Sequence, residues 1–201
     1  WFFRMRYGEA ASFLASGQNV RPTRLLEAGF RFAKPTIEDF FEGTDHAVVD
    51  RLDLHRYMGT WYEIARFDHR FERGLSEVTA TYTLMPDGTV RVENRGCKHK
   101  KPYDVCKTAE GRAKIPDPSQ PGKLKVSFFL SFYSDYYVLE LDQDEYNYAL
   151  IGSSSDKYLW ILSRAPILPE EIKKKLLDAA TRRGYDVKKL IWVEQREKKI
   201  M

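Results

Sequence analysis

The amino-acid sequence predicts an all-β protein built on eight antiparallel strands. From Trp61 onward, short runs of β-branched and aromatic residues alternate with turn residues at regular intervals. The connections between these runs are too short to contain crossover helices, which favours antiparallel neighbours. The chain has 201 residues and is 43% hydrophobic, so it is long enough to bury a core. Such spacing is typical of an up-and-down barrel or of a sandwich, and the pattern alone does not choose between them.

The eight expected strands are separated by residues that favour turns. Pro86, Asp87 and Gly88 form one such group, and similar groups follow at residues 117–122, 142–144 and 153–156. The strands are predicted at Trp61–Phe67, Glu77–Leu84, Thr89–Arg95, Thr108–Ala113, Lys123–Phe129, Tyr136–Leu141, Tyr146–Gly152 and Tyr158–Ser163.

A single helix is expected after the last of these strands. Pro169 suits a first helical turn, and the acidic Glu170 and Glu171 suit the positive end of a helix dipole. Apolar residues then recur at helical spacing until Gly184, which indicates the end of the helix. A short final strand is predicted at Leu190–Val193.

Three short motifs resemble the signatures of the lipocalin family. The run Gly59-Thr60-Trp61 on the first expected strand is similar to the Gly-x-Trp signature. Tyr146-Asn147-Tyr148-Ala149 resembles the second signature, and Arg164, which directly follows the eighth strand, resembles the third. All three occur in the expected order and at the expected separations.

The similarity is strongest to the bacterial outer-membrane lipocalins and extends over residues 50–195. The resemblance implies an eight-stranded antiparallel up-and-down barrel with one C-terminal helix packed outside. It also implies an interior that binds an apolar small molecule of the fatty-acid or lysophospholipid kind. These expectations come from the family and not from the strand pattern.

The N-terminal part carries a second resemblance. Tyr7–Ala11 and Gly17–Phe32 look like the C-terminal extension of sugar-nucleotide-epimerase-like, NAD-dependent proteins. We therefore expect a small, mainly helical segment at residues 1–44, with helices at Gly8–Ala15 and Thr36–Phe41, and a lipocalin domain at residues 45–201.

These two resemblances lead to different cellular locations. Because the sequence opens on Trp1, we expect it to belong to a longer gene product. A fusion to an epimerase-like enzyme implies the cytoplasm, whereas related lipocalins imply the periplasm or the outer membrane. The location is left open between them.

Catalysis, metal binding and nucleic-acid binding find little support in the sequence. Gly8 and Gly17 do not have the spacing of a dinucleotide-binding loop. The histidines lack the spacing of metal ligands and are interpreted as solvated surface residues. With a net charge of +4 and no basic stripe, the chain is not expected to bind nucleic acid. We expect no enzyme activity, cofactor or metal for this chain, and the oligomeric state stays open. The four histidines are His46, His55, His69 and His99.

An expected hairpin between the third and fourth strands carries two features with open alternatives. Cys97 and Cys106 flank its tip and are either a cross-hairpin disulfide or two free thiols. The basic run Lys98–Lys101 in the same loop is interpreted as solvated charge, with contact to phospholipid headgroups of a membrane surface as the alternative.

The lipocalin resemblance assigns a structural role to four residues, Gly59, Trp61, Tyr148 and Arg164. A tryptophan laid across one end of a barrel, with a guanidinium stacked on its face, would close that end. The rival interpretation is that Trp61 and Arg164 contact the ligand directly.

Alternation along the strands predicts which side chains line the interior. Residues two apart share a face, so an inward Trp61 implies that Glu63, Ala65 and Phe67 also point inward. An inward Glu63 carboxylate needs a partner, such as Arg66 or a tyrosine hydroxyl. With the other strands phased by family likeness, Ala80 also points inward. The expected ligand contacts are Ala65, Tyr82, Val92, Val126, Phe128, Ile151, Trp160 and Leu162.

The leading hypothesis for function is the carriage or storage of an apolar small molecule, without catalysis. The main alternative is that the lipocalin is a regulatory or docking module fused to the C-terminus of an epimerase-like enzyme. A third hypothesis is that residues 1–44 complete such an enzyme.

Overall fold

The computed structural model describes residue 27 and residues 43–99, 103–129 and 132–196. The chain divides into two compact units, Trp1–Glu42 and Gly43–Met201. The helices expected at Gly8–Ala15 and Thr36–Phe41 lie outside the described residues. The second unit contains every strand described below. Among the described residues, no helix is long and apolar enough to span a bilayer.

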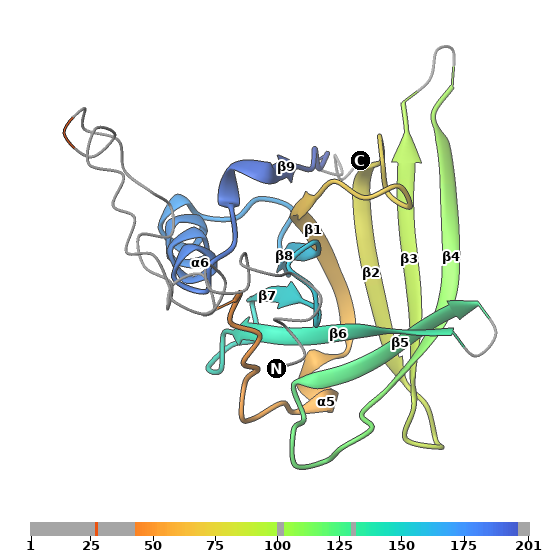
Figure 1. The fold of residues 1–201 in the computed structure, drawn as a ribbon. Coiled ribbons are helices and arrows are strands. Elements are labelled where there is room, and N and C mark those ends of the chain that lie inside the picture. Colours follow the sequence, from red (N-terminus) through yellow and green to blue (C-terminus); the bar gives the residue numbers. More distant parts are fainter. Residues whose placement is uncertain (1–26, 28–42, 100–102, 130–131, 197–201) are drawn as a thin grey trace, which may run out of the picture. The chain divides into compact units, whose positions relative to one another are not determined.

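Eight antiparallel strands close into a barrel, as the lipocalin resemblance implies (Figure 1). Each strand pairs with the next along the chain, and β1 pairs with both β2 and β8, which closes the ring. The short connections leave no alternative to antiparallel neighbours. The strands are β1 Gly59–Phe67, β2 Ser76–Leu84, β3 Val90–Lys98, β4 Val105–Lys114, β5 Lys123–Phe129, β6 Phe132–Leu141, β7 Tyr148–Gly152 and β8 Leu159–Ser163.

The remaining elements lie at one end or outside the barrel (Figure 1). The short helix α5, Leu54–Tyr57, precedes β1, and Asp53 caps it by accepting from the amides of His55 and Arg56. Helix α6, Glu170–Arg182, follows β8 and lies outside the barrel. The short 3-10 helix η1, Val187–Lys189, leads into β9, Leu190–Trp192, which adds a ninth strand by pairing with β1.

Several strand boundaries differ from the prediction. β4 begins at Val105, because that residue still pairs with Lys98 of β3. β6 begins at Phe132, because that residue pairs with Phe129 of β5. The first residues of β4 are exposed on both faces of the strand. They therefore lack the alternation of apolar and polar residues that would identify a strand in the sequence. β7 begins only at Tyr148, since Tyr146 has a φ of 58° in the preceding turn.

A β-bulge in β1 overturns part of the predicted interior. Glu63 pairs with Leu162 and Ala65 pairs with Ile161, so two steps along β1 match one step along β8. The extra residue reverses the alternation beyond it. The expectation that Ala65 and Phe67 face the interior is therefore wrong, and both lie in the outer apolar cluster.

Two apolar clusters lie on opposite sides of the barrel wall. The inner cluster lies on the inside of the barrel and includes Trp61, Val92, Ile151 and Leu162. The outer cluster lies between the barrel wall and α6, whose Leu176, Ala179 and Ala180 are buried there. Leu139, Leu150 and Ile161 supply the wall side of this contact, and the two clusters together account for alternate residues of β7 and β8.

Consecutive strands reverse direction, so the connections alternate between two ends. One end carries α5 and the connections after β2, β4 and β6, and we call it the closed end. The other carries the connections after β1, β3, β5 and β7, and we call it the open end. Figure 1 shows α5 far from the end of β3 and the start of β4, which belong to the other end.

Candidate functional site

The closed end is filled by Trp61, over whose ring the Arg164 guanidinium lies at 3.9 Å from the centroid. Trp61 is completely buried, and its indole N–H donates to the Tyr57 carbonyl at 2.9 Å. Arg164 donates hydrogen bonds to several backbone carbonyls around α5. These bonds offset the free-energy cost of removing its charge from water. These acceptors belong to Arg56, Tyr57, Met58, Thr60 and Tyr146.

Gly59 belongs to the same arrangement for a backbone reason. It has a φ of +93°, where side chains are strained, and a Cβ there would lie 3.4 Å from Nη1 of Arg164. The glycine therefore lets the chain turn from α5 into β1 directly beneath the guanidinium. Gly59, Trp61 and Arg164 are brought together by the fold as the motif implied.

Tyr148, the fourth expected closure residue, lies elsewhere. It is partly buried in the outer cluster, where its hydroxyl accepts from Nζ of Lys175 on α6 at 2.7 Å. Tyr146 takes its place at the closed end: the Tyr146 hydroxyl accepts from the Asp53 amide at 3.0 Å, and the Arg56 guanidinium lies 4.3 Å from its ring centroid. The two tyrosines are two residues apart, but the turn at Tyr146 separates them.

Three tyrosine hydroxyls meet inside the barrel next to Trp61. The Tyr136 hydroxyl lies 2.7 Å from that of Tyr57 and 3.0 Å from that of Tyr82. Burial raises the pKa of all three phenols, so they stay neutral and satisfy one another. Sequence reasoning placed Tyr82 inside but missed this cluster, because Tyr57 and Tyr136 come from elements far apart in the chain.

An apolar cavity of about 10 Å³ lies beside the three tyrosines. Beyond it, the inner wall toward the open end is formed by aliphatic and small side chains, which belong to the inner cluster. Of the expected ligand contacts, six lie on or against this wall: Tyr82, Val92, Val126, Ile151, Leu162 and Trp160.

Phe128 does not lie in the inner cluster, contrary to expectation. Its side chain is 44% exposed, and it borders an open depression of about 380 Å³ together with Arg91 and Glu110. The pairing of β5 with β6 shifts between Val126 and Phe129, so alternation from Val126 does not extend to it. The ring instead lies beside Gly111, where a Cβ would approach it to 2.8 Å.

A buried polar cluster lies toward the open end of the interior. Glu63 and Arg66 are almost fully buried and form an ion pair at 2.6 Å, which confirms Arg66 as the partner considered for Glu63. Arg66 also donates to the carbonyls of Glu72 and Leu75, and thereby holds the β1–β2 connection against the barrel. The sequence indicated the pair, but not its link to this connection.

Glu72, from the same connection, adds a second carboxylate. It accepts from the indole N–H of Trp160 at 3.2 Å and lies 2.9 Å from Nε2 of His69. His69 is largely buried and packs edge-on against Trp160 with 5.3 Å between ring centroids. The interpretation of His69 as a solvated residue is therefore wrong.

The two carboxyl groups of this cluster differ in their affinity for a proton. Burial, followed by the nearby charge of Glu72, raises the pKa of Glu63 to about 8, against the opposing effect of Arg66. Burial is the largest influence on Glu72 and acts to raise its pKa, but the contacts with His69 and Trp160 and the charge of Arg66 together outweigh it and lower the Glu72 pKa. Glu63 therefore takes up a proton at a higher pH than Glu72 does, although Arg66 stabilises its charged form.

The open end is also braced outside the barrel, at the base of the β3–β4 hairpin. Cys97 and Cys106 are directly paired across the two strands and are joined by a disulfide, so the free-thiol alternative is overturned. The sequence could not decide this, since it does not fix the strand register.

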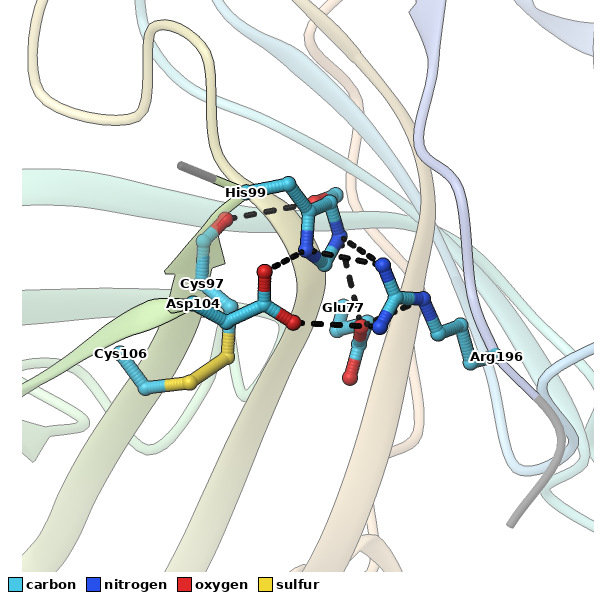
Figure 2. Close-up of a disulfide and its surroundings, with 7 residues drawn as sticks. Glu77, Cys97, His99, Asp104, Cys106 and Arg196 are labelled. Carbon is cyan, nitrogen blue, oxygen red and sulfur yellow. Dashed lines mark hydrogen bonds and ion pairs between the residues drawn. A yellow bond between two sulfur atoms is a disulfide. The ribbon is translucent and has the colours of Figure 1, made fainter. Parts of the chain in front are cut away.

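His99 is part of a charged cluster and not a separate solvated residue. Figure 2 shows its ring between the Asp104 carboxylate and the Arg196 guanidinium, at 2.8 and 3.0 Å. A Glu77 oxygen lies 3.4 Å from the ring and 3.3 Å from Arg196. Glu77, His99 and Asp104 are a set of metal-ligand types that the sequence did not reveal. Arg196 already supplies the positive charge among them, so we assign them a structural role.

Replacing Arg164 with alanine should lower the free energy of unfolding by about 1–3 kcal/mol, because stacking on Trp61 is lost and carbonyl acceptors are left without a donor. Thermal and denaturant unfolding of the full chain measure this. Arg182→Ala, at an exposed position near the end of α6, is the matched control and should leave stability unchanged. Equal stability of Arg164→Ala and the parent would contradict the assigned role.

The raised pKa of Glu63 predicts a pH dependence of stability. The folded protein retains a proton that the unfolded chain releases above 4.5, so stability should fall as pH rises from 4.5 toward about 8. Glu63→Gln cannot ionise and should weaken this dependence, measured as melting temperature against pH. Glu145→Gln, exposed in the β6–β7 connection, should retain it. An unchanged profile for Glu63→Gln would assign the proton to another group.

Comparison with known proteins places this geometry in a family. A lipocalin-like domain matches residues 52–195. A domain of unknown function matches residues 1–43, the segment that resembles the C-terminal extension of epimerase-like proteins.

Two relatives and one solved structure show the extent of the similarity. Over 148 residues the chain is 50% identical to outer membrane lipoprotein Blc of Escherichia coli (strain K12), covering 74% of this chain and 82% of that protein. It is 43% identical to temperature-induced lipocalin-1 of Arabidopsis thaliana over 158 residues, covering 74% and 82%. Insecticyanin from the tobacco hornworm Manduca sexta shares the fold, with a TM-score of 0.61 at 24% identity over 77% of this chain and 87% of that one. The chain belongs to the lipocalin family.

Proposed function

We propose that the barrel binds one apolar small molecule of the fatty-acid or lysophospholipid kind and acts as its carrier or store. The observation that carries this proposal is the inner wall between the tyrosine cluster and the open end. Polar groups gather at its two ends, whereas the wall between them is aliphatic, aromatic or small. Lipocalin relatives support the binding of a small hydrophobic ligand in general, and the acyl-chain identity is our own inference.

The acyl chain would lie above the tyrosine cluster, because the cavity beside those tyrosines is only about 10 Å³. Val92, Ile151 and Leu162 would contact it, and Trp160 would lie beside its upper part. Tyr82 and Val126 would form the floor. Ala65 and Phe128, which the structure places outside the inner cluster, are not part of this site.

The polar head of the ligand would lie on the open-end side of the acyl chain, and Asn94, in the middle of β3, would offer the ligand a polar contact. Asn94 alternates with the inward Val92 and pairs with Ala80, and its side-chain oxygen is buried without a hydrogen-bond partner among the described residues. Such an acceptor favours a hydrogen-bond donor on the ligand, since an unmatched buried oxygen is unfavourable. A hydroxyl or ammonium group of a lysophospholipid head would satisfy it.

Burial of the acyl chain supplies the driving force. At roughly 0.8 kcal/mol per buried methylene, about a dozen methylenes give on the order of 10 kcal/mol before ligand ordering is subtracted. We therefore expect a dissociation constant in the micromolar range, on the order of 1 μM.

Affinity should rise with acyl-chain length until the chain fills the site. Titration of fatty acids and lysophospholipids of increasing length, followed by the emission of Trp160, measures this. Trp160→Phe is the control for the signal of the other tryptophans. Affinity that does not depend on chain length would contradict an acyl-chain site.

A filling variant locates the site within the barrel. Ala80→Phe adds a ring to the inner wall and should lower affinity at least about tenfold, since each buried methylene displaced is worth a factor of several. Thr83→Phe, on the exposed outer face of the same strand, is the matched control and should bind as the parent does. Melting curves of both variants verify the fold, and equal affinity for the two would place the ligand elsewhere.

A second candidate function follows from the match at residues 1–43. In it, the lipocalin is a regulatory or docking module at the C-terminus of an NAD-dependent, epimerase-like enzyme. This candidate needs a boundary near residue 44, with an independently folding barrel.

Deletion of residues 1–44 should leave the barrel folded, with its melting temperature and acyl-chain affinity unchanged. Loss of folding on deletion would show that the N-terminal segment belongs to the lipocalin domain and would remove the fusion candidate. Circular dichroism and the same fluorescence titration provide both measurements.

A further inference from the structure

We propose that the open end of the barrel docks on a lipid bilayer that carries anionic headgroups. Of the ten exposed large hydrophobic residues in the described chain, seven belong to connections or strand ends at the open end. We call them the apolar rim: Phe71, Tyr103, Val105, Phe128, Phe129, Phe132 and Tyr133.

The β5–β6 hairpin presents the most concentrated part of the rim. Phe129 and Phe132 are paired across the two strands, and their side chains are 68% and 74% exposed. Two neighbouring phenylalanines at a hairpin end are unfavourable in water and have no partner in the described chain that covers them. Phe71, in the β1–β2 connection, is 74% exposed as well, and the Arg70 guanidinium lies 5.5 Å from its ring centroid.

The charge of the same end favours an anionic partner. The carboxylates of Asp68 and Asp104 there already form ion pairs with Arg73 and Arg196. Four exposed cations at this end have no ion-pair partner among the described residues, against three such acids, Glu110, Asp156 and Glu194. These cations are Arg70, Lys98, Lys107 and Lys157.

Aromatic rings with interspersed basic groups match the interfacial region of a bilayer. Rings insert among the headgroups and upper acyl chains, while long basic side chains reach the lipid phosphates. The rim is spread over three separate connections around the barrel mouth, which suits a fluid surface better than one fixed protein contact. An apolar molecule that leaves such a surface would enter the barrel without crossing water.

The β3–β4 hairpin is suited to bear part of this contact. The disulfide between Cys97 and Cys106 and the cluster of His99, Asp104 and Arg196 fix its base (Figure 2). The backbone next to Tyr103 and Val105 is therefore constrained, and less backbone freedom is lost on binding.

Vesicle flotation of the full chain tests the proposal. The probes are vesicles of phosphatidylcholine alone and of phosphatidylcholine mixed with phosphatidylglycerol. The parent should bind the anionic vesicles, and Phe129→Ser combined with Phe132→Ser should lower the partition coefficient on the order of tenfold. Ile167→Ser removes an exposed hydrophobic residue from the connection between β8 and α6, away from the rim, and should leave binding unchanged.

The charge contribution is tested separately. Lys98→Gln and Lys107→Gln should each weaken binding to anionic vesicles about fivefold, and addition of salt should weaken it further. Equal binding to vesicles with and without phosphatidylglycerol would contradict the anionic preference.

Three outcomes would overturn the proposal. The parent could fail to bind either vesicle, or the rim and control variants could bind alike. Alternatively, sedimentation could show a parental dimer that the rim variant dissociates, with no vesicle binding, which would assign the rim to a second copy. Acyl-chain titration of the same variants keeps this test distinct from the proposed function, because docking does not require a ligand in the barrel.

Discussion

Strand β1 is shared by three neighbours, and the rest of the barrel depends on how it divides between them. Its first residues pair with β2 and its middle with β8, which closes the ring, and its last residues pair with β9. One strand can serve all three because a bulge between Glu63 and Ala65 re-aims its side chains. Before the bulge the strand supplies Trp61 to the interior, and after it Ala65 and Phe67 to the contact with α6.

The same bulge explains where the buried charges lie. Arg66, next to the outward Ala65 and Phe67, is turned toward Glu63 and away from the apolar surface of α6. A buried ion pair needs further hydrogen bonds to offset its desolvation, and the carbonyls of the β1–β2 connection provide them. The connection is thus anchored by the charge that the bulge places inside the barrel.

Polar groups are concentrated at the two ends of the interior, and their hydrogen-bonding groups find partners in different ways. At the closed end, Arg164 and three tyrosine hydroxyls find partners within the chain. Toward the open end, Arg66 binds Glu63 and the carbonyls of the β1–β2 connection, and in the middle of β3 the side-chain oxygen of Asn94 is buried without a hydrogen-bond partner among the described residues. An apolar wall between two polar regions suits the elongated ligand with one polar end that we propose, since its apolar part would be buried and its polar part left near water.

The sequence by itself determined the fold class, the number of barrel strands and the closed end. Period-two runs with short connections restrict the chain to antiparallel neighbours, and Gly59, Trp61 and Arg164 are recognisable because their motifs are local. Only the tertiary structure decided the faces of Ala65, Phe67 and Phe128, because a bulge or register shift changes the alternation without a signature in composition. It also decided the roles of Tyr146, His69, Glu72 and the Cys97–Cys106 pair, since these depend on turns and strand register that bring together residues from separate elements.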